Sequence, residues 1–187
     1  MSVASNQWHV GLVGYGEVGR ILAEDLRKDG VRVSAYDIKL SDDRAQPLRD
    51  HALGIGVALA SSHADLAAQA DLIVSAVTAS QAVPVAQACV PGLKQGAWFL
   101  DFNSASPGAK QRAAVLIDGA GGRYVEGAVM TSLPPYRIKV PLLLGGSGAR
   151  ELAPLLIELG FNAKVASEQL GVASAVKMCR KIGRAHV

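Results

Sequence analysis

A glycine-spaced turn near the N-terminus constrains the fold of this chain more than any other stretch. An apolar run at residues 10–13 leads into Gly14-x-Gly16-x-x-Gly19, and apolar residues at helical spacing follow at once. The pattern predicts a strand, a tight turn and a helix. Gly14 allows the sharp turn, Gly16 lets the backbone approach a diphosphate, and Gly19 lets the helix pack closely on the strand.

The start of this helix is a candidate anion site, because its unpaired N–H groups and its dipole both favour phosphate. The residues that we expect to bind a cofactor here are Gly14, Tyr15, Gly16, Glu17, Val18 and Gly19. Similar turns also occur in methyltransferases and as plain connections between a strand and a helix. The turn alone therefore does not identify the ligand.

A second residue makes a dinucleotide the better interpretation. Residues 32–37 form the next predicted strand, and it ends on Asp37. The spacing is close to the roughly 20 residues expected for a carboxylate that binds a ribose 2′-hydroxyl. A carboxylate there repels a 2′-phosphate, so the sequence favours NAD over NADP. Methyl transfer stays open, because Asp37 can also bind the ribose of S-adenosylmethionine.

Composition argues against several other classes of protein. Half of the 187 residues are hydrophobic and 19% are charged, which is typical of a folded domain. No apolar run is long enough to span a bilayer, and residues 1–7 do not resemble a secretory signal, so we expect a cytoplasmic protein. The net charge of +3 gives no support to a nucleic-acid partner. Cys89 and Cys179 lack metal-ligand spacing, so no metal site or disulfide is expected.

Strand-like and helical patterns alternate along the rest of the chain. Further strands are predicted at residues 56–59, 71–77, 97–101, 123–129, 140–144 and 161–165. This alternation predicts a Rossmann-type α/β fold with a doubly wound, mostly parallel sheet and right-handed crossovers. We assign residues 1–166 to this domain and residues 167–181 to the first helix of a truncated all-α domain. Residues 182–187 back-translate to a common sequencing adapter, so we expect a non-native tail.

Ligands of such sheets bind outside the carboxyl ends of the strands. Polar side chains follow three of the predicted strands at this edge, and we expect them to share one crevice with the glycine turn. These side chains are Thr78, Asn103, Ser104 and Thr131, and we expect Asp37 and Met130 in the same crevice. Ser104 and Ser106 also suit an N-cap for the helix that Pro107 helps to start.

Three segments together resemble the β-hydroxyacid dehydrogenase superfamily, which includes 3-hydroxyisobutyrate and 6-phosphogluconate dehydrogenases. The glycine turn fits the cofactor fingerprint of that family. Asp101-Phe-Asn-Ser-Ala-Ser-Pro107 fits its cofactor and substrate loop, and Leu170-Gly-Val-Ala-Ser-Ala-Val-Lys177 resembles the helix that carries its catalytic lysine. The resemblance implies an NAD(P)-dependent oxidoreductase that acts on a small β-hydroxy acid, with or without decarboxylation, and a homodimeric full-length protein.

The resemblance also assigns roles to particular residues. Lys177 is the expected catalytic base, because oxidation of a hydroxyl by hydride transfer releases a proton that a neutral lysine amine can accept. Positive charge nearby favours the neutral amine, and Arg180 follows one helical turn later. The ordinary alternative for Lys177 is a surface lysine on an amphipathic helix. The expected cofactor contacts beyond the glycine turn are Thr78 and Asn103, and the expected substrate contacts are Ser104, Thr131 and Ser132.

Two positions depart from the family pattern. Met130 replaces a substrate-binding serine, and Lys181 stands where the family has an asparagine. A short-chain dehydrogenase is excluded, because no tyrosine has a lysine four residues later. A cofactor-binding module without catalytic activity is the remaining alternative, because the chain ends shortly after Lys177.

Overall fold

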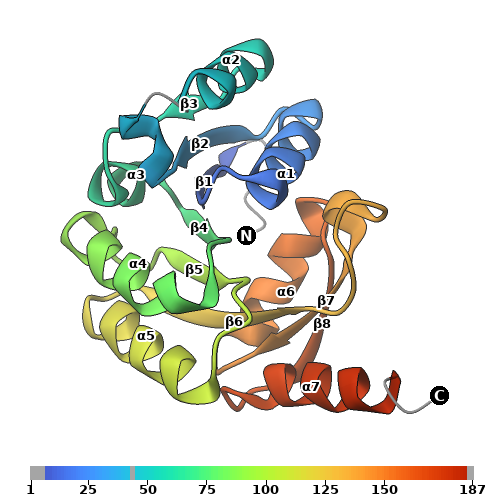
Figure 1. Ribbon diagram of the computed structural model, residues 1–187. Coiled ribbons are helices and arrows are strands. Elements are labelled where there is room, and N and C mark those ends of the chain that lie inside the picture. The colour runs from blue at the N-terminus through green and yellow to red at the C-terminus, as the bar shows by residue number, and fades with distance from the viewer. Residues whose placement is uncertain (1–6, 43–44, 185–187) are drawn as a thin grey trace.

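The computed structural model describes residues 7–42 and 45–184, with side chains up to residue 180. Within these ranges, eight strands form one sheet, and helices cover both of its faces (Figure 1). The strands are β1 (His9–Val13), β2 (Arg32–Tyr36), β3 (Ala58–Leu59), β4 (Leu72–Ser75), β5 (Trp98–Asp101), β6 (Arg123–Val129), β7 (Pro141–Gly145) and β8 (Asn162–Ser167). The α-helices are α1 (Glu17–Lys28), α2 (Gln46–Ile55), α3 (His63–Gln69), α4 (Ala82–Cys89), α5 (Pro107–Gly119), α6 (Ala149–Glu158) and α7 (Val172–Arg184). Short 3₁₀ helices are η2 (Ile38–Ser41), η4 (Ala79–Gln81), η5 (Val90–Gly92) and η6 (Arg137–Lys139).

The strand order places a ligand crevice beside the glycine turn. The order is β3-β2-β1-β4-β5-β6-β7-β8, and β1 pairs in parallel with both β2 and β4. The chain therefore builds outward from β1 in both directions, which opens a crevice between the carboxyl ends of β1 and β4. The expected Rossmann-type fold is confirmed.

The sheet is mostly parallel, as expected, with one reversal of strand direction. β7 runs antiparallel to β6, with Gly127 opposite Leu144. A parallel crossover needs about a dozen residues and usually a helix that covers the sheet. Residues 130–140 contain only the short η6, so the chain reverses instead. β8 pairs in parallel with β7, so both strands run against the other six.

The sheet buries both of its faces, which explains the continuous apolar strands. Leu12 and Leu100 belong to the cluster under α1, α2 and α6. Ile73 and Phe99 belong to the cluster under α3, α4 and α5. Successive strand residues point to opposite faces, so a strand with helices on both sides must be apolar at nearly every position.

Polar caps fix the starts of two helices where the sequence indicated them. The Ser62 hydroxyl accepts a hydrogen bond from the N–H of Asp65 at 3.0 Å and begins α3. The Ser106 hydroxyl accepts from the N–H of Ala109 at 3.3 Å and begins α5, with Pro107 as its first residue. Ser106 therefore supplies the cap, and Ser104 is left for another role.

Helix α7 ends the described part of the chain and packs against β6, β7 and β8. The helix continues through residues 182–184, within the segment that we expect to be non-native, and residues 185–187 lie outside the described range. No described helix combines the length and the apolar character needed to cross a membrane. The described residues also include no group of three or more His, Cys, Asp or Glu side chains that could hold a metal ion.

Candidate active site at the carboxyl edge of the sheet

The three glycines of the turn face different surroundings. A Cβ on Gly14, whose φ is +89°, would lie 2.3 Å from the carbonyl oxygen of Ala76, and a Cβ on Gly19 would lie 2.1 Å from the carbonyl oxygen of Gly14. Neither position has room for a side chain. A Cβ on Gly16, in contrast, would meet no atom within 4 Å. The backbone at Gly16 thus borders open space at the start of α1, where a diphosphate fits.

The carboxylate of Asp37 lies beside this turn. One oxygen accepts a hydrogen bond from the N–H of Tyr15 at 2.8 Å, and the other accepts from the N–H of Lys39 at 2.9 Å. A cavity of about 100 Å³ opens next to it, with Gly14 and His63 also in its wall. The ring of His63 packs edge-on against Tyr36, and burial lowers the pKa of His63. The glycine turn, the carboxylate of Asp37 and this small cavity together suit the adenosine part of a dinucleotide.

Tyr15 is used differently from its neighbours in the turn. Its side chain is fully buried, and its hydroxyl forms a 2.9 Å hydrogen bond with Nδ1 of His51. Burial raises the pKa of Tyr15 to about 12. Because its N–H is also bonded to Asp37, the contribution of Tyr15 is to hold the turn in place.

The hydrogen bonds from Tyr15 continue toward the β6–β7 connection. Nε2 of His51 bonds to Glu24 at 3.0 Å, and Arg137 bonds to the other oxygen of Glu24 at 2.6 Å. Arg137 also pairs with Asp25 at 2.9 Å. The hydrogen bonds from His51 and Arg137 lower the pKa of Glu24. These contacts hold Arg137 at a φ of 54°, which is rare outside glycine, and fasten the connection to α1.

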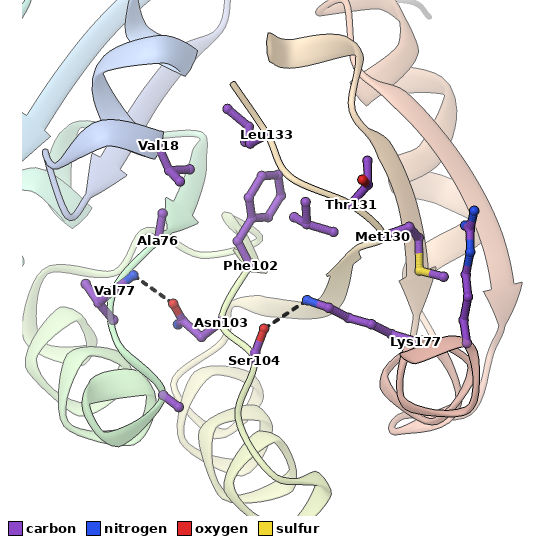
Figure 2. Close-up of a pocket in the computed structure, with 13 residues that line it drawn as sticks. Val18, Ala76, Val77, Phe102, Asn103, Ser104, Met130, Thr131, Leu133 and Lys177 are labelled. Carbon is purple, nitrogen blue, oxygen red and sulfur yellow. Dashed lines mark hydrogen bonds between the residues drawn. The ribbon is translucent and has the colours of Figure 1, made fainter. Parts of the chain in front are cut away.

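The main cavity has a volume of about 490 Å³ and lies at the carboxyl ends of β4, β5 and β6 (Figure 2). It is lined by Val18, Ala76, Val77, Ala79, Phe102, Asn103, Ser104, Val129, Met130, Thr131, Leu133, Lys177 and Arg180. These residues come from α1, three strand ends and α7. Of the residues expected to share one crevice, Val18, Asn103, Ser104, Met130 and Thr131 line this cavity, whereas Gly14 and Asp37 line the smaller one. Lys177 also lines the main cavity.

Lys177 reaches across this cavity to the loop after β5. Its Nζ donates a hydrogen bond to the hydroxyl of Ser104 at 2.9 Å, which is the dashed line between the two side chains in Figure 2. The two residues are 73 positions apart in the sequence. Their contact places an amine and a hydroxyl side by side in the wall of a cavity.

The first turn of α7 is held by a buried carboxylate that sequence reasoning missed. Glu126 on β6 is fully buried and accepts hydrogen bonds from the N–H of Gly171 at 2.6 Å and from the N–H of Ser174 at 2.8 Å. The hydroxyl of Ser174 donates to the same carboxylate. Glu126 thereby satisfies N–H groups at the start of the helix that carries Lys177. The only sequence signal was an acidic residue inside an apolar strand.

Asn103 ties two loops of the site together. Its side-chain oxygen accepts from the N–H of Val77 at 2.7 Å, and its amide donates to the hydroxyl of Ser75 at 3.0 Å. Its own N–H donates to Asp101 at 2.7 Å. Asn103 is only 3% exposed, so its main visible role is to join the ends of β4 and β5.

Six expected site residues line neither of these two cavities, namely Tyr15, Gly16, Glu17, Gly19, Thr78 and Ser132. Glu17 is exposed in the first turn of α1, and Ser132 is exposed in the β6–β7 connection. The exposed Thr78 bonds to the hydroxyl of Ser80 at 3.3 Å, while its neighbours Val77 and Ala79 line the main cavity. The sequence pattern placed Thr78 after β4 and Ser132 after β6 and left the directions of their side chains undetermined.

A buried lysine supports the floor of the site. Lys110 on α5 is fully buried, and its Nζ donates to the carbonyl oxygen of Asp101 at 3.3 Å and lies 3.8 Å from the carboxylate of Asp101. The hydroxyl of Tyr124 donates to the other oxygen of this carboxylate at 2.6 Å. Burial lowers the pKa of Lys110. Paired in this way, Asp101 fixes the end of β5 just before Asn103 and Ser104.

Comparison with known proteins agrees with this geometry. The family model described as the NAD-binding domain of 6-phosphogluconate dehydrogenase matches residues 9–132. Human mitochondrial 3-hydroxyisobutyrate dehydrogenase is 26% identical over 97% of this chain and 54% of its own length. A conserved hypothetical protein from Sinorhizobium meliloti has a solved structure with a TM-score of 0.90 and 34% identity, over 97% of this chain and 62% of that one. The structure of 3-hydroxyisobutyrate dehydrogenase from Mycobacterium tuberculosis, at 19% identity, shares the fold with a TM-score of 0.83, over 95% of this chain and 60% of that one.

The chain spans about half the length of the human relative. The family match begins at β1 and runs through the glycine turn, Asp37 and the loop after β5, so it includes most of the cavity wall. These findings confirm the resemblance that the sequence motifs indicated. The chain belongs to the family of the NAD-binding domain of 6-phosphogluconate dehydrogenase.

Proposed function

We propose that this chain is the cofactor-binding part of an oxidoreductase that transfers hydride between NAD(P) and a small β-hydroxy acid. The contact between Lys177 and Ser104 in the wall of the main cavity carries the proposal. Val18, in the first turn of α1, lines the same cavity, so the cofactor turn and the amine border one space. The name of the human relative, 3-hydroxyisobutyrate dehydrogenase, supports a hydroxy acid as the substrate.

Each part of the site would have a defined task. The bound nicotinamide supplies or accepts the hydride. The N–H groups of residues 16–19 would hold the diphosphate, and Asp37 would accept hydrogen bonds from the adenosine ribose. Ser104 would orient the substrate hydroxyl toward Lys177, whose neutral amine takes the proton as the hydride leaves. Thr131 would contact the substrate from the opposite wall. If decarboxylation follows, the same lysine can return its proton.

The preference for NAD over NADP can be tested by binding. We expect the protein to bind NADH more tightly than NADPH, because the carboxylate of Asp37 repels a 2′-phosphate. Asp37→Asn keeps an oxygen that can accept from the N–H of Tyr15 and removes the charge. This variant should narrow the affinity gap by about tenfold, the equivalent of about 1.4 kcal/mol. Fluorescence titration with both reduced cofactors measures the gap.

The matched control is Asp50→Asn on α2, an exposed aspartate that lines neither cavity. The control should leave both affinities unchanged. Equal affinities in the wild-type protein, or tighter binding of NADPH, would contradict the proposed preference. Failure to bind either cofactor would contradict the proposed function itself.

A cofactor-binding module without turnover is the second candidate, because the chain spans only 54% of the human relative. Under this candidate the protein binds NADH and forms none from NAD⁺ and 3-hydroxyisobutyrate. We expect negligible turnover for this chain alone, measured as absorbance of NADH. Measurable turnover would show that the described cavity is sufficient for catalysis.

A further inference from the structure

The main cavity has basic and no acidic residues in its wall. Among its lining residues, Lys177 and Arg180 are basic, and none is an aspartate or a glutamate. The carboxylates of Asp101 and Glu126 are fully buried and bonded to protein groups. The permanently charged Arg180, with no acidic group in the cavity wall, favours an anionic ligand.

The two basic side chains differ in the contacts that they provide to that ligand. Lys177 donates to Ser104, and its proposed role requires it to exchange a proton. Arg180 stays charged at any physiological pH, and its planar fork fits both oxygens of a carboxylate. Within the described part of the chain, the exposed side chain of Arg180 forms no hydrogen bond or ion pair. Its guanidinium is therefore available to a ligand.

Helix geometry places the two side chains on one face. Residues three apart on a helix are neighbours, and both Lys177 and Arg180 line the cavity. A β-hydroxy acid carries its hydroxyl and its carboxylate on one short carbon chain, which suits two neighbouring side chains. The β6–β7 connection lines the cavity with the apolar side chains of Met130 and Leu133, and Met130 places a thioether where the sequence resemblance implies a substrate-binding serine (Figure 2).

We propose that Arg180 binds the substrate carboxylate, so that α7 provides both the carboxylate anchor and the amine that faces the hydroxyl. This inference rests on the proposed function and adds a residue that determines specificity. The ligand class is a small carboxylic acid with a hydroxyl group on the β-carbon and a short apolar substituent that packs against Met130. The β6–β7 connection then shapes the apolar end of the site.

The test measures binding of 3-hydroxyisobutyrate, with and without NADH, by calorimetric titration. NADH cannot oxidise the probe, so the equilibrium is read without turnover. Arg180→Gln should weaken binding of the acid by roughly tenfold or more, and Arg180→Lys should recover part of the loss, because a single charge replaces a two-pronged contact. The methyl ester of the probe should bind more weakly to the wild-type protein and should not respond to Arg180→Gln.

Arg112→Gln on α5 is the matched control, because Arg112 is an exposed helical arginine outside the cavity. It should leave binding of the acid unchanged. Wild-type affinity for the acid in Arg180→Gln, or no binding of the acid by the wild-type protein, would overturn the assignment of Arg180. If inorganic phosphate bound to the site as strongly as the acid does, the proposed selectivity of Arg180 for a carboxylate would be overturned. Binding of NADH is measured in a separate titration. A protein that does not bind NADH would contradict the proposed function rather than the anion site.

Discussion

At the scale of single residues, the glycine turn separates two reasons for having no side chain. Gly19 packs against the backbone at Gly14, so its role concerns the fold. Gly16 adjoins open space and has a φ of −78°, which any residue can adopt, so neither packing nor φ requires a glycine there. Packing therefore explains the glycine at position 19, and the proposed diphosphate contact would explain the one at position 16.

Alanine at these two positions should therefore give opposite results. Gly19→Ala forces a methyl group against a carbonyl oxygen and should lower the free energy of unfolding by about 1–3 kcal/mol. Gly16→Ala should unfold like the wild-type protein and bind NADH at least several times more weakly, because the methyl group occupies the space of the diphosphate. Urea denaturation and NADH fluorescence titration of both variants check the pair. Normal NADH binding by Gly16→Ala would argue against a diphosphate at this turn.

At the scale of elements, the position of α7 depends on one buried carboxylate. The carboxylate of Glu126 on β6 accepts hydrogen bonds from the N–H groups of Gly171 and Ser174, and these bonds fix the start of the helix. Lys177 follows within the next turn, so its reach to Ser104 is set by this attachment. A strand residue that faces no cavity therefore positions the amine of the site.

Glu126→Gln should loosen α7 from the sheet. The amide nitrogen cannot accept a hydrogen bond, so one buried N–H loses its partner at a cost of about 1–3 kcal/mol. Amide hydrogen exchange should become faster in α7 under conditions where exchange in β1 and α1 is unchanged. Glu168→Gln is the control, because Glu168 forms an exposed ion pair with Arg150 and should change stability by less than about 0.5 kcal/mol. Unchanged exchange in α7 of Glu126→Gln would contradict the proposed attachment.

At the scale of the whole molecule, the sequence predicted those elements of the fold that depend on local residue patterns. The first strand, the turn and α1 follow from adjacent residues, and β6 occupies the predicted residues 123–129. The reversed direction of β7 was missed, because a short apolar run is equally typical of a parallel and of an antiparallel strand. Periodicity indicates which residues are buried and gives no strand direction.

The candidate site was predictable in part for the same reason. Ser104 and Lys177 came from motifs, and the structure brings them together. The bonds from Tyr15 through His51 to Glu24 join residues far apart in sequence, so no local pattern marks them. Buried Lys110 and Glu126 were also missed, because their partners lie on other elements. Long-range polar contacts are thus the part of this site that needed the structure.

The central claim is that a nicotinamide dinucleotide lies along the carboxyl edge of the sheet, with its diphosphate on the glycine turn. The most direct measurement is a titration of ¹⁵N-labelled protein with NADH, followed by the backbone amide signals in NMR spectra. The account predicts that the largest shifts occur at residues 14–19 and at Asp37, with smaller shifts around Ser104, and little change in β8 and α6. Binding of NADH that leaves the amides of residues 14–19 unshifted would contradict it.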